Sequence, residues 1–259
     1  MTLDPATLEL KKGILRAACR AGEGHIPSAF SILDIVWALY DKVMTKDDIF
    51  ILSKGHGCLA LYAVLAAKKV IRKKDLMSFC QPGSILGGHP DRNKVPGVEA
   101  STGSLGHGLP IAVGRALAKK IKKEPGRVFC LIGDGEANEG SVWESLMLAT
   151  HHELINLTVI VDYNGSTKQA LDISPLDDKF KAFGFYTLGC SGHDDIDLST
   201  SLKLSSKFRP MAVIASTTKG NGVPRFAEPE WHHRAPTQQE LKQILIDLEF
   251  SYSLDAHLL

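Results

Sequence analysis

The sequence has almost no excess of charge: its 259 residues include 30 Lys and Arg against 29 Asp and Glu, for a formal net charge of +1. A protein that binds nucleic acid through its phosphates needs a basic excess, so we expect no nucleic-acid partner. Hydrophobic residues make up 44% of the chain, whereas intrinsic disorder combines low hydrophobicity with high net charge. The composition is therefore that of a chain that folds around a core.

Other signals are also missing. No apolar run reaches the roughly 20 residues that a membrane span requires, and residues 1–5 lack the basic and apolar pattern of a secretory signal. The five cysteines are scattered without a CxxC pair, which is typical of buried free thiols in a reducing compartment. We therefore expect a cytoplasmic protein with no membrane association.

Hydrophobic periodicity predicts alternating helices and strands. Helices are expected to begin at Asp4–Pro5 and after Ser31, and to occupy residues 59–70, 111–121, 141–151, 180–183 and 240–248. Short apolar runs predict strands at residues 49–52, 128–132, 157–161 and 211–216. Continuous apolar strands that alternate with helices imply a parallel sheet with helices on both faces, which is an α/β fold. The glycine-rich segment 82–109 is expected to form functional loops.

The strongest local signal is Gly133-Asp134-Gly135, directly after the predicted strand 128–132. The next strand leads into Asn164, so Asp134 and Asn164 should lie at the carboxyl ends of neighbouring strands, where open α/β sheets bind ligands. Carboxylate and amide oxygens suit Mg²⁺ or Ca²⁺, and the glycines let the backbone approach a diphosphate. The alternative is a tight strand-to-helix turn with no ligand.

Three histidines, His25, His56 and His89, stand beside glycine in predicted loops. Imidazoles in such positions can donate to phosphate or carbonyl oxygens and can transfer protons near neutral pH. A single loop histidine is more often exposed and idle, but three of them upstream of the Gly-Asp-Gly turn favour a shared site. The runs STGSLGHG at residues 101–108 and WHHRAP at residues 231–236 are further candidates.

The combination of Gly-Asp-Gly with an Asn about thirty residues later resembles the thiamine-diphosphate signature, and the spacing here is 30 residues. In that family the Asp, the Asn and a backbone carbonyl two residues further on hold the metal. The resemblance therefore implies Asp134, Asn164 and the carbonyl of Ser166 as ligands of Mg²⁺ or Ca²⁺. The histidine segments, of the forms GH, S-x-GH and GHP, resemble those of transketolases. This resemblance covers the chain from about residue 10 to about residue 248.

The resemblance to transketolases implies a fold, a cofactor and a reaction. The fold is the diphosphate-binding domain of thiamine-diphosphate enzymes, and the reaction transfers a two-carbon ketol unit from a ketose to an aldose acceptor. The implied catalytic residues are His25, His56, His89 and His233, with His232 as the less favoured register of the last. The implied cofactor-binding residues are His56, Gly103, Leu105, Gly133, Asp134, Gly135, Asn164 and His233.

The chain departs from the transketolase pattern in domain content. A transketolase has three domains, whereas residues 1–259 match a single first domain, and nothing matches the second-domain glutamate that activates the cofactor. The resemblance therefore implies the N-terminal subunit of a split transketolase. An enzyme of this kind acts on a sugar or sugar phosphate only when a C-terminal subunit with the pyrimidine-binding domain is also present, and a 2+2 assembly is expected.

A second departure is the short segment 164–179, in which polar Gly165–Lys168 replaces residues that usually include an aliphatic one. That aliphatic side chain normally supports the bent cofactor. Either Leu105 and the partner support it here, or Lys168 faces a different substrate.

Two other interpretations remain open. Residues 136–140 (EANEG) resemble the α subunit of a 2-oxoacid dehydrogenase, which uses the same cofactor to decarboxylate but needs fewer active-site histidines. A non-catalytic homologue of the cofactor domain is the other possibility, favoured by the altered loop after Asn164. Glu139 and Glu144 match acids at transketolase subunit contacts, and equally fit the role of carboxylates at a helix N-terminus.

Overall fold

The computed structural model describes residues 4–169 and 171–256. Within these residues one sheet contains five strands in the order β1-β2-β3-β5-β4. The strands are β1 (Ile49–Leu52), β2 (Val128–Gly133), β3 (Leu157–Tyr163), β4 (Tyr186–Ser191) and β5 (Met211–Ser216). Every pairing is parallel, so the carboxyl ends of the strands meet at a single edge of the sheet.

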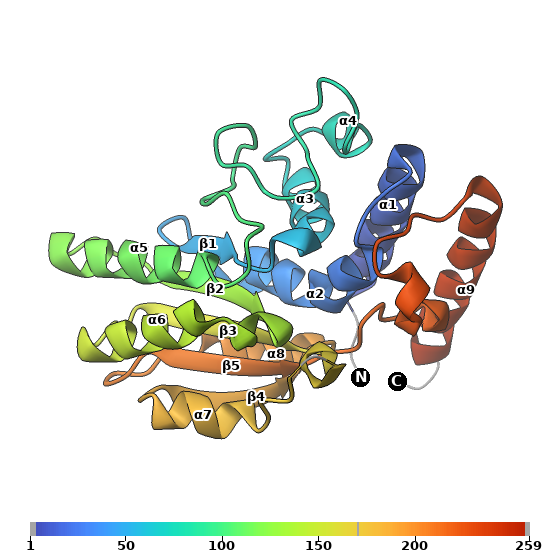
Figure 1. The fold of residues 1–259 in the computed structure, drawn as a ribbon. Helices are drawn as coiled ribbons and strands as arrows, with labels where there is room; N and C mark the ends of the chain where they lie inside the picture. The colour runs from blue at the N-terminus through green and yellow to red at the C-terminus, as the bar shows by residue number, and fades with distance from the viewer. Residues whose placement is uncertain (1–3, 170, 257–259) are drawn as a thin grey trace.

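Helices cover both faces of this sheet (Figure 1). One layer contains α1 (Pro5–Ala21), α2 (Ile26–Ala38), α3 (Cys58–Ala67) and α8 (Asp195–Lys203), with α9 (Gln238–Ala256) packed beside α1. The opposite layer contains α5 (Gly108–Lys122), α6 (Gly140–His151) and α7 (Leu176–Ala182). The short helix α4 (Lys73–Leu76) follows α3. The predicted α/β fold with a parallel sheet between two helical layers is confirmed.

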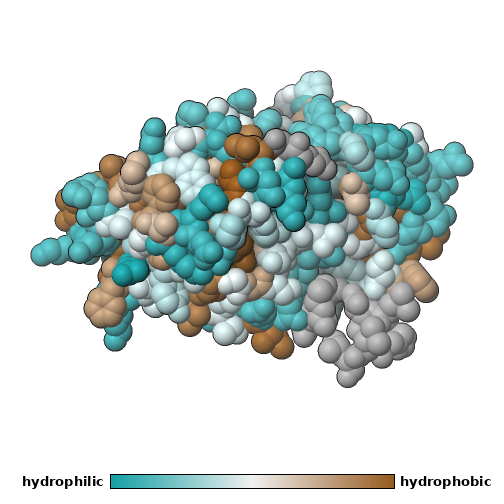
Figure 2. Space-filling view, turned by 60° about the horizontal axis from the view of Figure 1, so that its bottom comes forward, coloured by the Kyte–Doolittle hydropathy of each residue, from teal (hydrophilic) through white to brown (hydrophobic). Residues whose placement is uncertain are grey.

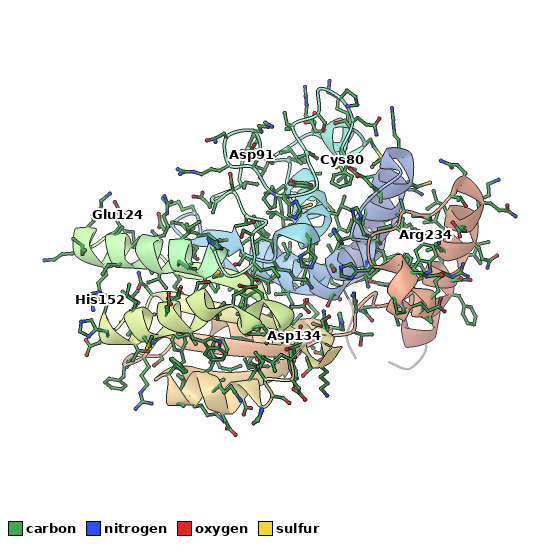
Figure 3. All side chains as sticks on the ribbon, viewed as in Figure 1. Cys80, Asp91, Glu124, Asp134, His152 and Arg234 are labelled. Atoms are coloured by element: carbon green, nitrogen blue, oxygen red, sulfur yellow. The ribbon has the colours of Figure 1, made fainter. Side chains whose placement is uncertain are left out.

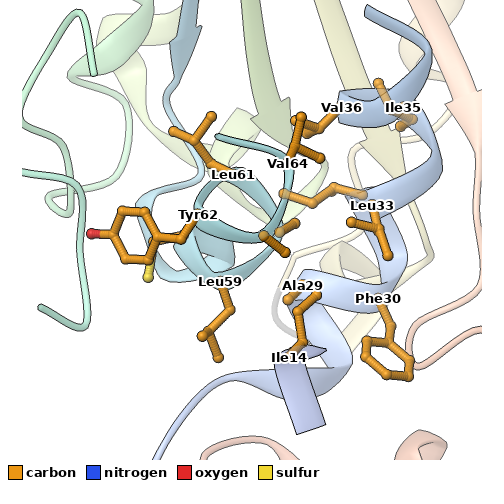
Figure 4. Packing of buried hydrophobic residues seen from close by; sticks show 14 of the residues in the cluster. Ile14, Ala29, Phe30, Leu33, Ile35, Val36, Leu59, Leu61, Tyr62 and Val64 are labelled. Carbon is orange, nitrogen blue, oxygen red and sulfur yellow. The ribbon is translucent and has the colours of Figure 1, made fainter. Parts of the chain in front are cut away.

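The continuous apolar runs in the strands are explained by these two layers. In β2, Phe129 and Leu131 pack into the cluster formed with α1, α2 and α3, while Cys130 and Ile132 pack into the cluster formed with α5 and α6. Neighbouring residues of a strand point to opposite faces, so a strand buried on both faces must be apolar at every position. Figure 4 shows the first cluster, in which side chains of α2 and α3 interlock.

Two helix N-termini were predicted, with different outcomes. The first is confirmed, since Asp4 caps α1 by accepting a hydrogen bond from the Ala6 amide at 2.9 Å and Pro5 occupies the first turn. The second is wrong: α2 begins at Ile26 rather than after Ser31, with Pro27 in its first turn. Ser31 is buried inside the helix, and its hydroxyl donates to Asp162 instead of capping.

The sequence did not predict β4 and α8. β4 is an edge strand whose residues are mostly half-buried or exposed, so it lacks the apolar run that identified the other strands. α8 is short and polar, and Asp194 caps it by accepting from the amides of Ile196 and Asp197. The remaining predicted elements are present with bounds that differ by at most four residues, except that α9, predicted to end at residue 248, continues to Ala256.

The surface is mostly hydrophilic on the face seen in Figure 2, where apolar side chains lie in small separate patches. No helix within the described part of the chain is long and apolar enough to cross a membrane.

Candidate active site

A cleft of about 870 Å³ opens at the edge of the sheet where the strands end. Its walls come from the loops that follow β1, β2, β3 and β5, and Figure 3 shows Asp134 in this region. Nine of the residues implied to act in catalysis, cofactor binding or metal binding line the cleft: His25, His56, Gly103, Leu105, Gly133, Asp134, Gly135, Asn164 and Ser166. The segments that carry them are far apart in sequence and converge because the parallel strands share one edge.

A smaller cavity of about 220 Å³, here called the histidine pocket, adjoins the cleft. His25 and His56 line both cavities, and the pocket adds the other two predicted histidines, His89 and His233. The structure therefore brings together every residue that was proposed for catalysis, cofactor binding or metal binding. Their roles stay predictions.

Asp134 has one carboxylate oxygen with an obvious partner and one without. Oδ1 accepts from the Gly135 amide at 2.7 Å, whereas Oδ2 is buried and accepts no hydrogen bond from the described residues. Burial raises the pKa of Asp134, and the neighbouring Asp162 carboxylate raises it further. A buried carboxylate oxygen without a partner is costly, and a cation would satisfy it.

Asn164 lies at the other predicted ligand position. Its Oδ1 accepts from the Ser166 amide at 3.0 Å and from the Ser166 hydroxyl. No group of three or more His, Cys, Asp or Glu side chains suited to a metal occurs among residues 4–169 and 171–256. A cation here would thus depend on Asp134, on amide and carbonyl oxygens, and on oxygens of the bound molecule, which is the donor set that Mg²⁺ favours.

Gly135 lies in the wall of the cleft beside Asp134. A Cβ atom at this position would have no protein atom within 4 Å. At Gly106, by contrast, a Cβ would clash with the Ser141 hydroxyl. The glycine at position 135 is therefore not required by protein packing, and its effect is to leave space in the cleft. Both Gly135 and the unpartnered Asp134 oxygen fit a bound diphosphate with its cation.

A buried ion pair that the sequence analysis missed forms the floor of the cleft. Asp162, the sixth residue of β3, is fully buried and pairs with the Lys54 ammonium. Its carboxylate also accepts from the hydroxyls of Ser31 and Thr217 and from the Asn164 amide at 3.2 Å. The hydrogen bonds hold this carboxylate in place, and its pairing with Lys54 fixes the lysine beside the cleft.

A second buried carboxylate, Glu136, connects three loops. It accepts from the Ser53 hydroxyl at 2.5 Å and from the amides of Gly106 and Gly133 at 2.9 and 3.2 Å. These residues belong to the loop after β1, to the glycine-rich segment and to the Gly-Asp-Gly turn. Burial raises the pKa of Glu136, and these hydrogen bonds oppose that effect. Glu136 thereby fixes the glycine-rich segment against the end of β2.

Lys219 and His232 complete the charged wall of the cleft. The Lys219 ammonium donates to Nδ1 of His232 at 3.0 Å, so Nδ1 is the acceptor and neutral His232 carries its proton on Nε2. Burial lowers the pKa of Lys219, and the nearby Lys54 charge lowers it further. His232 lines the cleft, whereas His233 lines the histidine pocket, so both registers considered for the late histidine lie at the site.

The histidines at the junction of the two cavities are uncharged. Burial lowers the pKa of His25 to about 4, and burial together with the Lys54 charge lowers that of His56 to about 2. The ring centroid of His25 lies 4.4 Å from that of His233 and 5.3 Å from that of His56. Nδ1 of His25 is 2.9 Å from the carbonyl of His232, which only accepts, so Nδ1 carries the proton. Nε2 of His25 is then free to accept a proton.

Some of the missed residues had a signal in the sequence. Lys54 stands inside the run Ser53–Gly57, which drew attention only for its histidine, and Lys219 is followed by glycine in a loop after a predicted strand. Asp162 had no such signal, because it continues an apolar strand and its burial depends on Lys54 from another loop. Residue 170, within the short segment 164–179, lies outside the described residues.

Residues 14–253 match a family model described as the thiamine diphosphate binding domain of transketolase. Among curated proteins, the chain is 40% identical over 253 residues to an apulose-4-phosphate transketolase subunit of Actinobacillus succinogenes, with 91% of each chain covered. It is 33% identical over 258 residues to a 6-deoxy-6-sulfo-D-fructose transketolase subunit of a Clostridium species, with 93% of this chain and 94% of that protein covered.

The fold is similar to that of solved transketolases. The structure of the Leishmania mexicana transketolase superposes with a TM-score of 0.81 at 27% identity and covers 96% of this chain. The same match covers 42% of the Leishmania protein, so the chain spans less than half the length of that transketolase.

Proposed function

The chain belongs to the transketolase family of transferases, as its thiamine-diphosphate-binding domain, and we propose that it is the N-terminal subunit of a split transketolase. In this proposal it transfers a two-carbon ketol unit from a ketose to an aldose acceptor. The observation that carries the proposal is the joint cavity, in which an unpartnered Asp134 oxygen lies in a charged cleft beside a pocket of four histidines.

The residues of the cleft fit thiamine diphosphate together with Mg²⁺. Asp134, Asn164 and the carbonyl of Ser166 would hold the cation, and Gly133 and Gly135 would let the diphosphate approach the backbone. Gly103, Leu105, His56 and the late histidines would contact the rest of the cofactor. Lys54 and Lys219 also line the cleft and would supply positive charge to attract the diphosphate. When bound, the cofactor supplies a carbon nucleophile that the protein itself lacks.

The histidine pocket would bind the sugar and transfer its protons. His25 is neutral and has its proton on Nδ1, so Nε2 can accept a proton from a substrate hydroxyl and return it later. His89 and His233 face the same cavity and would hold the hydroxyl and carbonyl oxygens of the sugar. Because burial lowers the pKa of His25 to about 4, this imidazole is neutral at neutral pH and would bind the hydroxyls of the sugar without competing with the diphosphate for cations.

The names of relatives of similar length support a proposal for the partner and the substrate. Those relatives are named as transketolase subunits, and we propose that residues 1–259 form one domain that works with a second chain carrying the pyrimidine-binding and C-terminal domains. A 2+2 assembly would place the site between chains. The relatives are named for apulose 4-phosphate and for 6-deoxy-6-sulfofructose, so we propose a ketose that ends in a phosphate or sulfonate.

The test is reconstitution. The purified chain, the purified C-terminal subunit from the same genome and their mixture are each assayed for ketol transfer with Mg²⁺, thiamine diphosphate and a series of anionic ketoses. We expect turnover in the mixture alone, because neither chain holds both ends of the cofactor. Full turnover by this chain without a partner would refute the split arrangement. Decarboxylation of a 2-oxoacid by the mixture would favour the dehydrogenase interpretation instead.

A further inference from the structure

A buried Asp–His pair that belongs to neither cavity lies behind the wall of the cleft. Nδ1 of His193, in the loop between β4 and α8, lies 2.6 Å from Oδ2 of Asp34 in α2. The two residues are only 5% and 7% exposed. Although burial alone would raise it, the pKa of Asp34 lies below its ordinary value, because the Lys11 charge and the His193 hydrogen bond outweigh burial. Ionised Asp34 accepts, so Nδ1 of His193 donates.

The other imidazole nitrogen is occupied by the backbone. The amide of Thr218 donates to Nε2 of His193 at 2.8 Å. One nitrogen of His193 donates to Asp34 and the other accepts from the Thr218 amide, so both ring nitrogens are engaged within the protein. An Asp–His pair of this kind orients what it contacts. What it contacts here is the backbone directly before Lys219.

The loop 217–220 is held on several sides. Thr217 donates through its amide to the carbonyl of Tyr163 at 3.1 Å and through its hydroxyl to Asp162. The Gly220 amide donates to the carbonyl of Pro27 at 3.0 Å. Between these attachments lies Lys219, whose ammonium reaches into the cleft and donates to His232. The His193 bond fixes the peptide between Thr217 and Thr218 and so restricts the backbone from which Lys219 extends into the cleft.

We propose that His193, oriented by Asp34, is a positioning residue that fixes the loop 217–220 and through it the placement of Lys219 and His232 at the cofactor cleft. This inference deepens the proposed function and rests on it in one respect, namely that the cleft binds a diphosphate. The role of the hydrogen bond in ordering the loop does not depend on that assumption.

Two substitutions test the hydrogen bonds of the two imidazole nitrogens of His193 one at a time. In His193→Asn the amide nitrogen lies near the position of Nδ1, so it still donates to Asp34 but leaves the Thr218 amide without its acceptor. In His193→Gln the amide oxygen reaches the position of Nε2, so it still accepts from Thr218 but leaves Asp34 with one donor fewer. His151→Asn, on the exposed end of α6, is the matched control.

The three variants and the wild type are compared by three measurements. The melting temperature and the amide hydrogen exchange of a peptide covering residues 217–223 are measured on the full chain. The affinity for thiamine diphosphate with Mg²⁺ is measured by calorimetry on the full chain mixed with the C-terminal subunit. We expect His193→Asn to keep its melting temperature, to exchange at Thr218 roughly tenfold faster and to bind about 3- to 10-fold more weakly. We expect His193→Gln to melt roughly 5 °C lower with near wild-type exchange and affinity.

A merely structural role would not produce faster exchange and weaker binding in one variant and a lower melting temperature in the other. If the Asn variant keeps wild-type exchange and affinity, or if both variants lose affinity in proportion to their loss of melting temperature, the positioning role is refuted. If the wild type and the control fail to bind thiamine diphosphate, the proposed function fails. In that case exchange at Thr218 still decides the role of His193.

Discussion

The floor of the cleft and the histidine pocket lie at the same edge of the sheet, yet the first contains buried charged side chains and the second contains uncharged ones. In the floor, Asp162 and Lys54 are buried as a charged pair, with hydroxyl and amide donors around the carboxylate. In the pocket, burial removes charge, since the pKa of His25 falls to about 4 and that of His56 to about 2. The difference comes from the groups that surround each side chain and not from burial alone.

Asp162 pairs with Lys54 and accepts hydrogen bonds from three further side chains. For His56, burial and the nearby Lys54 charge both favour the neutral form. In the proposed function the two regions have different roles. The fixed charges would hold a charged cofactor, and the neutral imidazoles would accept and return protons. Each of the following predictions tests whether the two regions can be altered independently.

The largest effect is expected in the pocket. His25→Ala and His89→Ala should lower turnover of the assembled enzyme by about 10²–10⁴-fold while leaving the affinity for thiamine diphosphate nearly unchanged, because in the proposed function these imidazoles act on the sugar. Steady-state kinetics with saturating cofactor measure the first quantity, and calorimetry measures the second. If either variant keeps full turnover with saturating sugar, the substituted histidine is not a catalytic residue.

In the cleft, Asp134→Ala should remove the only charged ligand of the proposed cation. We expect affinity for thiamine diphosphate with Mg²⁺ to fall by about 10²-fold or more, with no loss of thermal stability, because the carboxylate is buried with one oxygen unpartnered. Calorimetry and a melting curve are sufficient. Unchanged affinity in a folded variant would contradict the metal assignment.

The neutral pocket predicts an acid-sensitive stability. His25 and His56 are uncharged in the folded chain, whereas in the unfolded chain each takes up a proton near its ordinary value of 6.5. The unfolded state therefore binds more protons as the pH falls below about 6.5, and stability decreases from that pH toward 4. The loss should be on the order of 2 kcal/mol between pH 7 and pH 5, mostly from the more enclosed His56.

Urea unfolding midpoints at pH 7.5, 6 and 5 measure this loss. His56→Gln should flatten the dependence, and the exposed His151→Gln should leave it unchanged. An equally steep curve in His56→Gln would mean that the pocket histidines are not kept neutral by the fold.

The smallest effect is expected for Gly135→Ala. The added methyl group meets no protein atom within 4 Å, so the melting temperature should stay constant. Because the methyl group occupies the cleft, affinity for the cofactor should fall about tenfold. A drop in melting temperature without a change in affinity would show that the glycine serves the fold and not the ligand.

The parts of the molecule that could be predicted from the sequence share one property: each is recognisable from a short segment of the chain. The strands β1, β2, β3 and β5 are apolar runs, and the Gly-Asp-Gly turn with its distant Asn stands out in a single pass along the chain. β4 was missed because an edge strand is only partly buried and has no such run. The start of α2 was misplaced because a weak capping signal at Ser31 competed with Pro27 in the true first turn.

The missed site residues depend on tertiary structure. Lys54 and Asp162 are 108 positions apart, and nothing in either local sequence indicates that they pair. The same holds for His193 and Asp34, which are 159 positions apart. A lysine or histidine in a loop is ordinarily exposed, and only the folded structure shows which of them are buried with a carboxylate.

The bonds to Asp162 also bear on how the sheet chooses its alignment. Its partners include Lys54, which follows β1, and Thr217, which follows β5, so a single carboxylate in β3 is joined to loops on both sides of its own strand. Apolar runs are poor guides to alignment, because Val, Ile and Leu pack acceptably one step up or down the ladder. A shift of β3 by one residue would turn Asp162 to the opposite face, among the apolar side chains of α5 and α6, without its cation. We expect this energetic penalty to disfavour misaligned strand pairings while the chain folds.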